Sequence, residues 1–292
     1  MTDYFLLGLL GHPLSNSLSP ALHAAALNFA GLDGEYRLID IAPENFRDEW
    51  PTILNTGLTG LNITIPYKQD IFGLVSKLSP EAKLVGAINT VKIENGNLIG
   101  HNTDLLGFKQ SYIDTFGDNS LNNQTALVIG AGGSAKAVII GLIQMGVSRI
   151  LLTGRDQQKV NKFIDKITNN SSMIDDTNRP VSIIYIDQNK LQNNTNEIAT
   201  IINATPIGLT SQTIPDWFEE LTTNISPQCT FFDLVYSKDG SNPALTQLAN
   251  SKKLKTIDGL TMLIHQARYA FEYWTGINIP FKVMYKGLPF AR

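Results

Sequence analysis

The sequence predicts an α/β protein of two domains, an N-terminal α/β substrate domain followed by a Rossmann-like dinucleotide-binding domain. Two observations lead to this fold class. Short apolar runs alternate with helix-forming segments along most of the chain. In addition, the stretch at 125–137, TALVIGAGGSAKA, joins an apolar strand to a helix through a glycine-rich turn. With 292 residues, the chain is long enough to form a separate core in each domain.

The first domain is expected to cover residues 1–103. A helix should begin at Ser19-Pro20, since serine is a good N-cap and proline suits the first turn. The sequence Glu94-Asn95-Gly96-Asn97 predicts a hairpin, because Asn-Gly tolerates positive φ. Strands are predicted at 4–10, 36–41, 58–65, 91–93 and 98–99, and further helices at about Pro43, from Tyr67 and after Ser79-Pro80.

The second domain is expected to cover residues 104–257, starting with a connecting helix over 104–116. A polar stretch, 169–180, is interpreted as a surface loop. The last long pattern, DGLTMLIHQARYAFEYW, has helical spacing, and we expect the helices within 258–292 to pack back on the first domain. Strands of the second domain are predicted at 125–130, 149–153, 181–186, 200–203 and 230–235.

Composition indicates the kind of partner. The formal charge is -3 and no basic run is present, so neither nucleic acid nor a membrane is expected to bind. The chain has one cysteine, Cys229, which excludes an internal disulfide and suits a reducing compartment. The apolar N-terminal stretch carries the acidic Asp3 and is too short to span a bilayer. We therefore expect a cytoplasmic protein that acts on a small molecule.

The glycine-rich turn is a candidate phosphate site. Gly130, Gly132 and Ala135 fit the Gly-x-Gly-x-x-Gly/Ala pattern, in which the glycines allow a tight turn and close approach of a pyrophosphate. A helix beginning near Gly133 would add free N–H groups and a favourable dipole. The alternative is a strand-to-helix turn without a ligand. The flanking apolar strand and helix favour the nucleotide site.

Four polar clusters in the first half follow predicted strands, where open α/β sheets bind ligands. Each has a structural alternative: Ser19 as an N-cap, Asn89 and Asn102 as turn residues, and Lys68 as a solvated charge. Their concentration in one domain favours a polar site. No pair of histidines has metal-ligand spacing, so no metal is expected. The clusters are Ser17 with Ser19; Asn62, Thr64 and Lys68; Asn89 with Thr90; and Asn102, Thr103 and Asp104.

The chain resembles the shikimate dehydrogenase family over nearly its whole length. The motifs occur in the family's order, which makes chance agreement very improbable. They are Gly11-His12-Pro13, Ser17-Leu18-Ser19-Pro20 with His23, Asn62-Ile63-Thr64-Ile65-Pro66-Tyr67-Lys68, Gly86-Ala87-Ile88-Asn89-Thr90, Gly100-His101-Asn102-Thr103-Asp104, the turn Gly130-Ala131-Gly132-Gly133, Asn203-Ala204-Thr205-Pro206, Asp258-Gly259-Leu260 and Gln266.

The resemblance implies reversible, NADP-linked reduction of 3-dehydroshikimate to shikimate in aromatic amino acid biosynthesis. Lys68 would be the catalytic acid and base, and Asp104 would orient its ammonium group and favour its charged form. A polyhydroxylated ring needs many polar partners, since an unpaired buried group costs about 1–3 kcal/mol. By motif, Ser17, Ser19 and Tyr236 would hold the substrate carboxylate, and Asn62, Thr64, Asn89, Asp104 and Gln266 would read the ring hydroxyls.

The cofactor residues follow from the same resemblance, with one departure. The family usually has Asn-Arg-Thr after the second dinucleotide strand, whereas this chain has Thr153-Gly154-Arg155-Asp156. We predict NADP because Arg155 and Lys159 remain, with Asp156 as a partial counterweight to these cations. The implied cofactor-binding residues are Gly130, Ala131, Gly132, Gly133, Ser134, Ala135, Thr153, Arg155, Lys159, Ala204, Thr205, Val235, Gly259 and Met262.

Two other functions compete with this one. A quinate/shikimate dehydrogenase paralogue would act on a related cyclic hydroxy acid, and only kinetics separates it from the first reading. A catalytically silent dinucleotide-binding regulator is disfavoured, since such a protein has no need of a proton donor like Lys68 paired with a carboxylate like Asp104. A monomer or a homodimer is expected.

Overall fold

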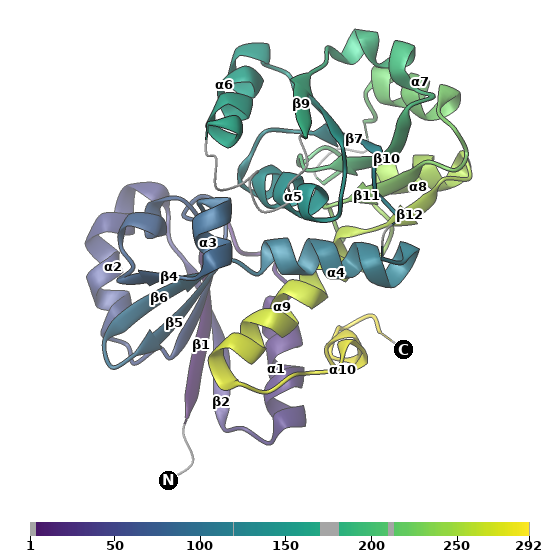
Figure 1. Ribbon diagram of the computed structural model, residues 1–292. Coiled ribbons are helices and arrows are strands. Elements are labelled where there is room, and N and C mark those ends of the chain that lie inside the picture. Colours follow the sequence, from purple (N-terminus) through teal and green to yellow (C-terminus); the bar gives the residue numbers. More distant parts are fainter. Residues whose placement is uncertain (1–3, 119, 170–180, 210–212, 292) are drawn as a thin grey trace. The chain divides into compact units, whose positions relative to one another are not determined.

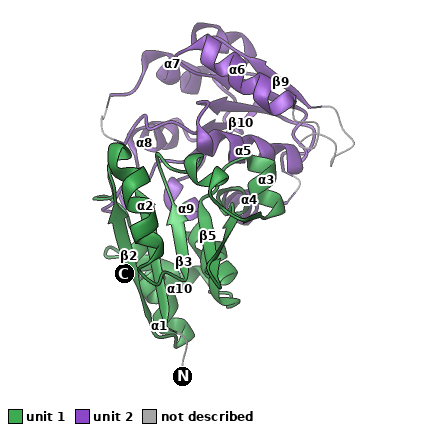
Figure 2. Ribbon diagram, turned by 90° about the vertical axis from the view of Figure 1, so that its left-hand side faces the viewer, with its two compact units in different colours: residues 1–107, 263–292 green, residues 108–262 purple. Residues whose placement is uncertain are grey.

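The computed structural model describes residues 4–118, 120–169, 181–209 and 213–291. The chain divides into two compact units, residues 1–107 with 263–292 and residues 108–262 (Figure 2). Each unit contains its own six-stranded sheet, which confirms the predicted α/β class. The predicted surface loop at 169–180 lies almost wholly outside the described residues. Among the helices that are described, none combines the length and apolar character needed to cross a bilayer.

The sheet of the first unit is mixed. Its order is β2-β1-β3-β5-β6-β4, with β1 parallel to β2 and β3, and with β5 antiparallel to β3 and β6. Asn95 and Gly96 have φ values of 50° and 75°, which confirms the predicted hairpin turn between β5 and β6. The strands are β1 (Phe5–Gly11), β2 (Gly34–Asp40), β3 (Gly60–Ile63), β4 (Lys77–Leu78), β5 (Thr90–Glu94) and β6 (Asn97–His101).

Helices cover this sheet on both sides, with α2 at its left and α1, α9 and α10 at its right in Figure 1. Phe46, Trp50 and Ile53 of α2 contribute to a buried cluster with the sheet residues Leu6, Leu10 and others. On the other side, the indole of Trp274 in α9 donates a 2.9 Å hydrogen bond to the carbonyl of Val91. The helices are α1 (Ser19–Ala30), α2 (Phe46–Leu54), α3 (Pro80–Val85), α9 (Gly259–Thr275, of which residues 263–275 belong to this unit) and α10 (Phe281–Lys286), with short 3-10 turns at Pro43–Asn45 and Asp70–Gly73.

Two local predictions were wrong. Ser19 is not an N-cap: it is the first residue of α1, the preceding Leu18 provides no side-chain cap, and the backbone N–H of Ser19 donates to Oγ of Ser17. No α-helix begins at Tyr67. Its side chain is buried and donates to the carbonyl of Ile41, and only the 3-10 turn Asp70–Gly73 follows before the short strand β4.

The sheet of the second unit is entirely parallel, with the order β12-β11-β10-β7-β8-β9. In chain order this is the doubly wound arrangement of a Rossmann fold, in which the connections change direction between β7 and β10. Ligands bind such sheets at the carboxyl ends of the strands beside this point. The strands are β7 (Thr125–Ile129), β8 (Arg149–Thr153), β9 (Ser182–Tyr185), β10 (Ile198–Asn203), β11 (Thr230–Asp233) and β12 (Lys255–Ile257).

Helices pack on this sheet around two apolar layers. Phe218 and Leu221 of α7 belong to a buried cluster with Leu127 and Phe231 of the strands. Phe108 of α4 stacks on Phe232, with ring centroids 5.2 Å apart. The helices are α4 (Asp104–Phe116, of which residues 108–116 belong to this unit), α5 (Gly133–Gln144), α6 (Gln157–Thr168), α7 (Asp216–Asn224) and α8 (Ala244–Ser251), with a 3-10 segment at Gln188–Asn194.

His23 of α1 is a buried histidine without a hydrogen bond to any described residue at either ring nitrogen. Its ring lies flat on that of Tyr36, with centroids 4.3 Å apart. Burial lowers the pKa of His23 to about 3, although the Asn62 amide opposes this shift. The imidazole is therefore neutral in the folded protein at ordinary pH.

Replacing His23 by phenylalanine should make stability less sensitive to acid. Unfolded His23 takes up a proton near pH 6.5, whereas the folded form resists this down to about pH 3, so the native protein loses stability as pH falls through this window. The linkage amounts to on the order of 2 kcal/mol at about pH 5. Urea unfolding at about pH 7.5 and about pH 5 should show a smaller decline for His23→Phe than for the unmodified protein. Equal declines would contradict the account.

Candidate active site

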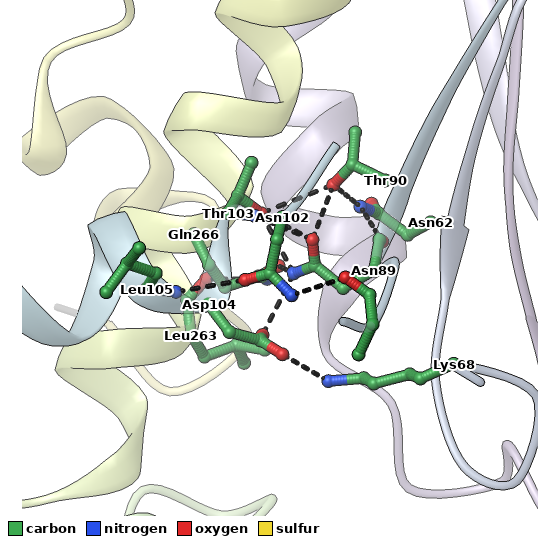
Figure 3. A network of polar contacts seen from close by, with 11 residues as sticks. Asn62, Lys68, Asn89, Thr90, Asn102, Thr103, Asp104, Leu105, Leu263 and Gln266 are labelled. Atoms are coloured by element: carbon green, nitrogen blue, oxygen red, sulfur yellow. Dashed lines mark hydrogen bonds and ion pairs between the residues drawn. The ribbon is translucent and has the colours of Figure 1, made fainter. Parts of the chain in front are cut away.

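Lys68 and Asp104 form an ion pair in the first unit. The Nζ atom of Lys68 lies 2.5 Å from Oδ2 of Asp104, and their side chains are 15% and 10% exposed (Figure 3). Lys68 follows β3 in a turn, whereas Asp104 is the first residue of α4. The pair therefore joins segments that are 36 residues apart in the sequence. The carboxylate of Asp104 therefore holds the lysine nitrogen at one place.

Asn89 fixes the carboxylate of this pair. Its Nδ2 donates to Oδ1 of Asp104 and to Oγ1 of Thr103, both at 2.9 Å. Its Oδ1 accepts the backbone N–H of Thr103 at 2.7 Å, which sets the orientation of the amide. Both oxygens of Asp104 are thus engaged, one with Asn89 and one with Lys68. Gln266 of α9 completes the group, with Oε1 3.4 Å from Nδ2 of Asn89.

Asn62 lies next to Asn89, and hydrogen bonds to neighbouring residues fix the orientation of its side-chain amide. Its Nδ2 donates to the carbonyl of Asn89 and to Oγ1 of Thr90, each at 3.1 Å. Its Oδ1 accepts the hydroxyl of Tyr36 at 2.9 Å. Both amide protons are used inside the unit, so the remaining hydrogen-bonding capacity of Asn62 is that of an acceptor.

The loop at residues 12–18, which we call the serine loop, joins β1 to α1 and carries Ser17. Ser19 at the start of α1 is 5% exposed. A side chain added at Gly11 would collide with Cγ2 of Thr64, so Thr64 lies beside the point where the chain enters this loop. Tyr236, the other residue predicted to bind the carboxylate, belongs to the second unit, where it is half-buried and burial raises its pKa.

The glycine turn of the second unit has the geometry of an anion site. Gly130 has a φ of 109°, and an added Cβ would lie 3.0 Å from the carbonyl oxygen of Ala204 and 2.7 Å from Thr205. At Gly132 and Gly133 an added Cβ would meet nothing within 4 Å in the described structure. Helix α5 begins at Gly133, and its N-cap residue Gly132 provides no side chain to accept the first N–H groups of the helix. These residues fit a pyrophosphate.

The segment after β8 contains the exposed Arg155 and the neighbouring Asp156, whose carboxylate caps a helix. Asp156 caps α6 by accepting the backbone N–H of Lys159 at 3.1 Å, and its carboxylate also lies 3.7 Å from Nζ of Lys159. Arg155 is exposed and forms no recorded hydrogen bond or ion pair with the residues that the structure describes. The hydroxyl of Thr153 is buried and likewise has no partner among them. Arg155 is therefore available for an anionic group.

Gly259 of α9 packs on the backbone after β11. Its N–H donates to the carbonyl of Val235 at 3.0 Å, and any side chain there would collide with the carbonyl of Leu234. Met262 is buried one turn later. Asp233, which sequence reasoning did not single out, is fully buried; burial raises its pKa to about 7, against hydrogen bonds from Asn203, Val235 and Thr246.

A Rossmann-type unit with an open glycine turn, joined to a unit with a lysine–carboxylate pair among amides, defines a two-domain, dinucleotide-dependent oxidoreductase. Comparison with known families is more specific. Residues 9–91 match the shikimate dehydrogenase substrate binding domain, residues 114–234 match the shikimate / quinate 5-dehydrogenase family, and residues 259–286 match the shikimate 5'-dehydrogenase C-terminal domain. The chain belongs to the shikimate dehydrogenase family.

Individual relatives agree over the full length. A shikimate dehydrogenase (NADP(+)) from Desulforamulus reducens is 34% identical over 95% of this chain and 92% of its own. The crystal structure of shikimate dehydrogenase from Aquifex aeolicus has a TM-score of 0.83 at 29% identity, covering 99% of this chain and all of its own (100%). The crystal structure of the Thermus thermophilus enzyme in complex with NADP(H) and shikimate has a TM-score of 0.82 at 30% identity. The match covers 99% of this chain and 100% of that one.

Proposed function

We propose that this protein catalyses the reversible, NADP-linked reduction of 3-dehydroshikimate to shikimate, a step in aromatic amino acid biosynthesis. The observation that carries the proposal is the 2.5 Å pair of Lys68 and Asp104 within a network of amides and hydroxyls. A proton donor held beside several neutral polar groups suits a polyhydroxylated substrate with one reacting keto group. The full-length relative named shikimate dehydrogenase (NADP(+)) supports the same reaction.

Lys68 is assigned the proton transfer. The glycine turn at 130–135 would hold a reduced nicotinamide cofactor, which would supply the hydride for the keto carbon and so leave negative charge on the keto oxygen. Lys68 stabilises this charge and donates a proton to the oxygen; in the reverse direction it accepts the proton from the hydroxyl. Asp104, held by Asn89 through Oδ1, keeps the lysine nitrogen in place through Oδ2.

Two sets of residues are proposed to bind the substrate, one at its carboxylate and one at its ring hydroxyls. Ser17, Ser19 and Tyr236 are proposed to donate hydroxyl hydrogen bonds to the substrate carboxylate. Because both amide protons of Asn62 are engaged, we assign it the role of accepting from a ring hydroxyl. The remaining hydroxyl contacts are assigned to Thr64, Asn89, Asp104 and Gln266.

For the cofactor, the turn at 130–135 is proposed to hold the pyrophosphate and Arg155 the 2′-phosphate, with a weaker contribution from Lys159. The cap bond from Lys159 N–H keeps the Asp156 carboxylate at the start of α6, which supports NADP over NAD. Thr153, Ala204, Thr205, Val235, Gly259 and Met262 are assigned to the rest of the cofactor surface. We further propose that the enzyme works in the cytoplasm as a monomer or a homodimer.

The decisive assay measures turnover with shikimate and with quinate, each with NADP and with NAD. Quinate is included because the family that matches residues 114–234 covers both substrates by name. We expect the highest kcat/KM for shikimate with NADP. A preference for quinate would indicate the paralogue, and binding of NADP without any turnover would indicate the regulator.

A further inference from the structure

The carboxylate of Asp40 ties the serine loop to the end of β2. Oδ2 of Asp40 accepts the backbone N–H of Leu14 at 2.9 Å, and Oδ1 lies 2.7 Å from Nδ1 of His12. Within the loop, the N–H of Ser17 donates to the carbonyl of Leu14 at 3.0 Å. Leu14 therefore links the carboxylate of Asp40 to the backbone of Ser17.

The position of Asp40 follows from the sheet register. Strands β1 and β2 are parallel, and Asp40 at the end of β2 is the register partner of Gly11 at the end of β1. Its side chain thus stands beside the place where the chain leaves β1 for the serine loop. The hydrogen bond from Leu14 and the neighbouring His12 lower the pKa of Asp40, so the carboxylate stays ionised at neutral pH.

We propose that Asp40 is a positioning residue for the substrate carboxylate: it holds the serine loop so that the hydroxyls of Ser17 and Ser19 meet that group. The inference rests on the proposed function. It makes a prediction of definite sign, because Asp40 carries the same charge as the substrate carboxylate. If Asp40 were only a surface charge, removing it would reduce repulsion and strengthen substrate binding. As a positioning residue, its removal weakens binding.

Two variants separate the two contacts of Asp40. Asp40→Asn keeps an oxygen for the N–H of Leu14 and loses the charge opposite His12, whereas Asp40→Ala loses both. We expect the KM for shikimate to rise about threefold to tenfold in Asp40→Asn and more than about tenfold in Asp40→Ala. The kcat and the KM for NADP should stay within about twofold, since the loop does not contribute to the reacting groups.

Asp33→Asn is the matched control, because it removes the same charge at an exposed position just before β2. The KM of Asp33→Asn for shikimate should equal that of the unmodified enzyme. Shikimate methyl ester provides the second readout: without a carboxylate to hold, its KM should rise much less in the Asp40 variants than the KM of shikimate. Thermal unfolding of each variant shows whether the fold is intact, and Asp40→Asn alone carries the test if Asp40→Ala does not fold.

The proposal is overturned if Asp40→Asn lowers the KM for shikimate or leaves it unchanged, or if shikimate and its methyl ester are affected equally. These results are distinct from a failure of the proposed function. If the proposed function were wrong, the unmodified enzyme would not oxidise shikimate at all. If only the role of Asp40 were wrong, the unmodified enzyme would oxidise shikimate, and the Asp40 variants would lack the expected increase in KM.

Discussion

Replacing Lys68 by alanine is expected to lower kcat by about two to four orders of magnitude, the range typical of a lost general acid–base group. The KM for shikimate should change far less, because the serine loop and the amides that we propose to bind the substrate are left in place. Steady-state kinetics in the direction of shikimate oxidation measures both quantities. Turnover at the normal rate by Lys68→Ala would remove Lys68 from the reaction.

Lys68→Arg and Lys92→Ala serve as controls. The arginine variant keeps a positive charge opposite Asp104 but cannot give up a proton at ordinary pH, so it should remain nearly inactive while binding substrate. Lys92 forms a partly exposed ion pair with Glu94 on β5, and its loss should leave kcat unchanged. If Lys68→Arg were as active as the unmodified enzyme, Lys68 would act through its charge alone.

Arg155→Ala is expected to raise the KM for NADP by about one to two orders of magnitude, the equivalent of a lost charged hydrogen bond. An arginine can bind a phosphate through two parallel N–H groups. Arg155 is exposed, whereas the carboxylate of Asp156 caps helix α6. The KM for NAD, which lacks the 2′-phosphate, should barely change. Kinetics with both cofactors, and titration of NADPH binding by fluorescence, measure the effect.

Arg149→Ala is the matched control for this variant, since Arg149 lies at the opposite end of the same strand, β8, and pairs with Glu197. Arg149→Ala removes the same charge and should leave the KM for NADP unchanged. An equal loss of NADP and NAD binding in Arg155→Ala would show that Arg155 supports the fold. If the unmodified enzyme prefers NAD, the prediction of NADP is wrong.

Local sequence signals predicted much of the fold. The strand β8 and the helix α4 lie where their apolar patterns placed them, and the Asn95-Gly96 hairpin follows from backbone conformation alone. The short strands β4 and β12 escaped prediction, because two or three residues give no measurable periodicity. The helix predicted from Tyr67 is absent because burial of that side chain, a tertiary contact, determines the local backbone.

The candidate site could be predicted only in part, for a similar reason. Lys68, Asn89 and Asp104 stand out as polar residues after strands, and the structure brings them into one network. Tyr36 and Asp40 do not stand out, since they lie on an edge strand outside any motif. Each acts across 26 residues of sequence, Tyr36 on Asn62 and Asp40 on Leu14, and such contacts depend on strand register rather than on local pattern.

The most direct test of the proposed reaction is turnover of shikimate carrying deuterium at the carbon that bears the reacting hydroxyl, with NADP as the acceptor. Hydride transfer from that carbon predicts NADPH that contains the deuterium, at a rate that falls by about two or more orders of magnitude in Lys68→Ala. Deuterium lost to water, or NADPH formation that does not depend on Lys68, would contradict the account.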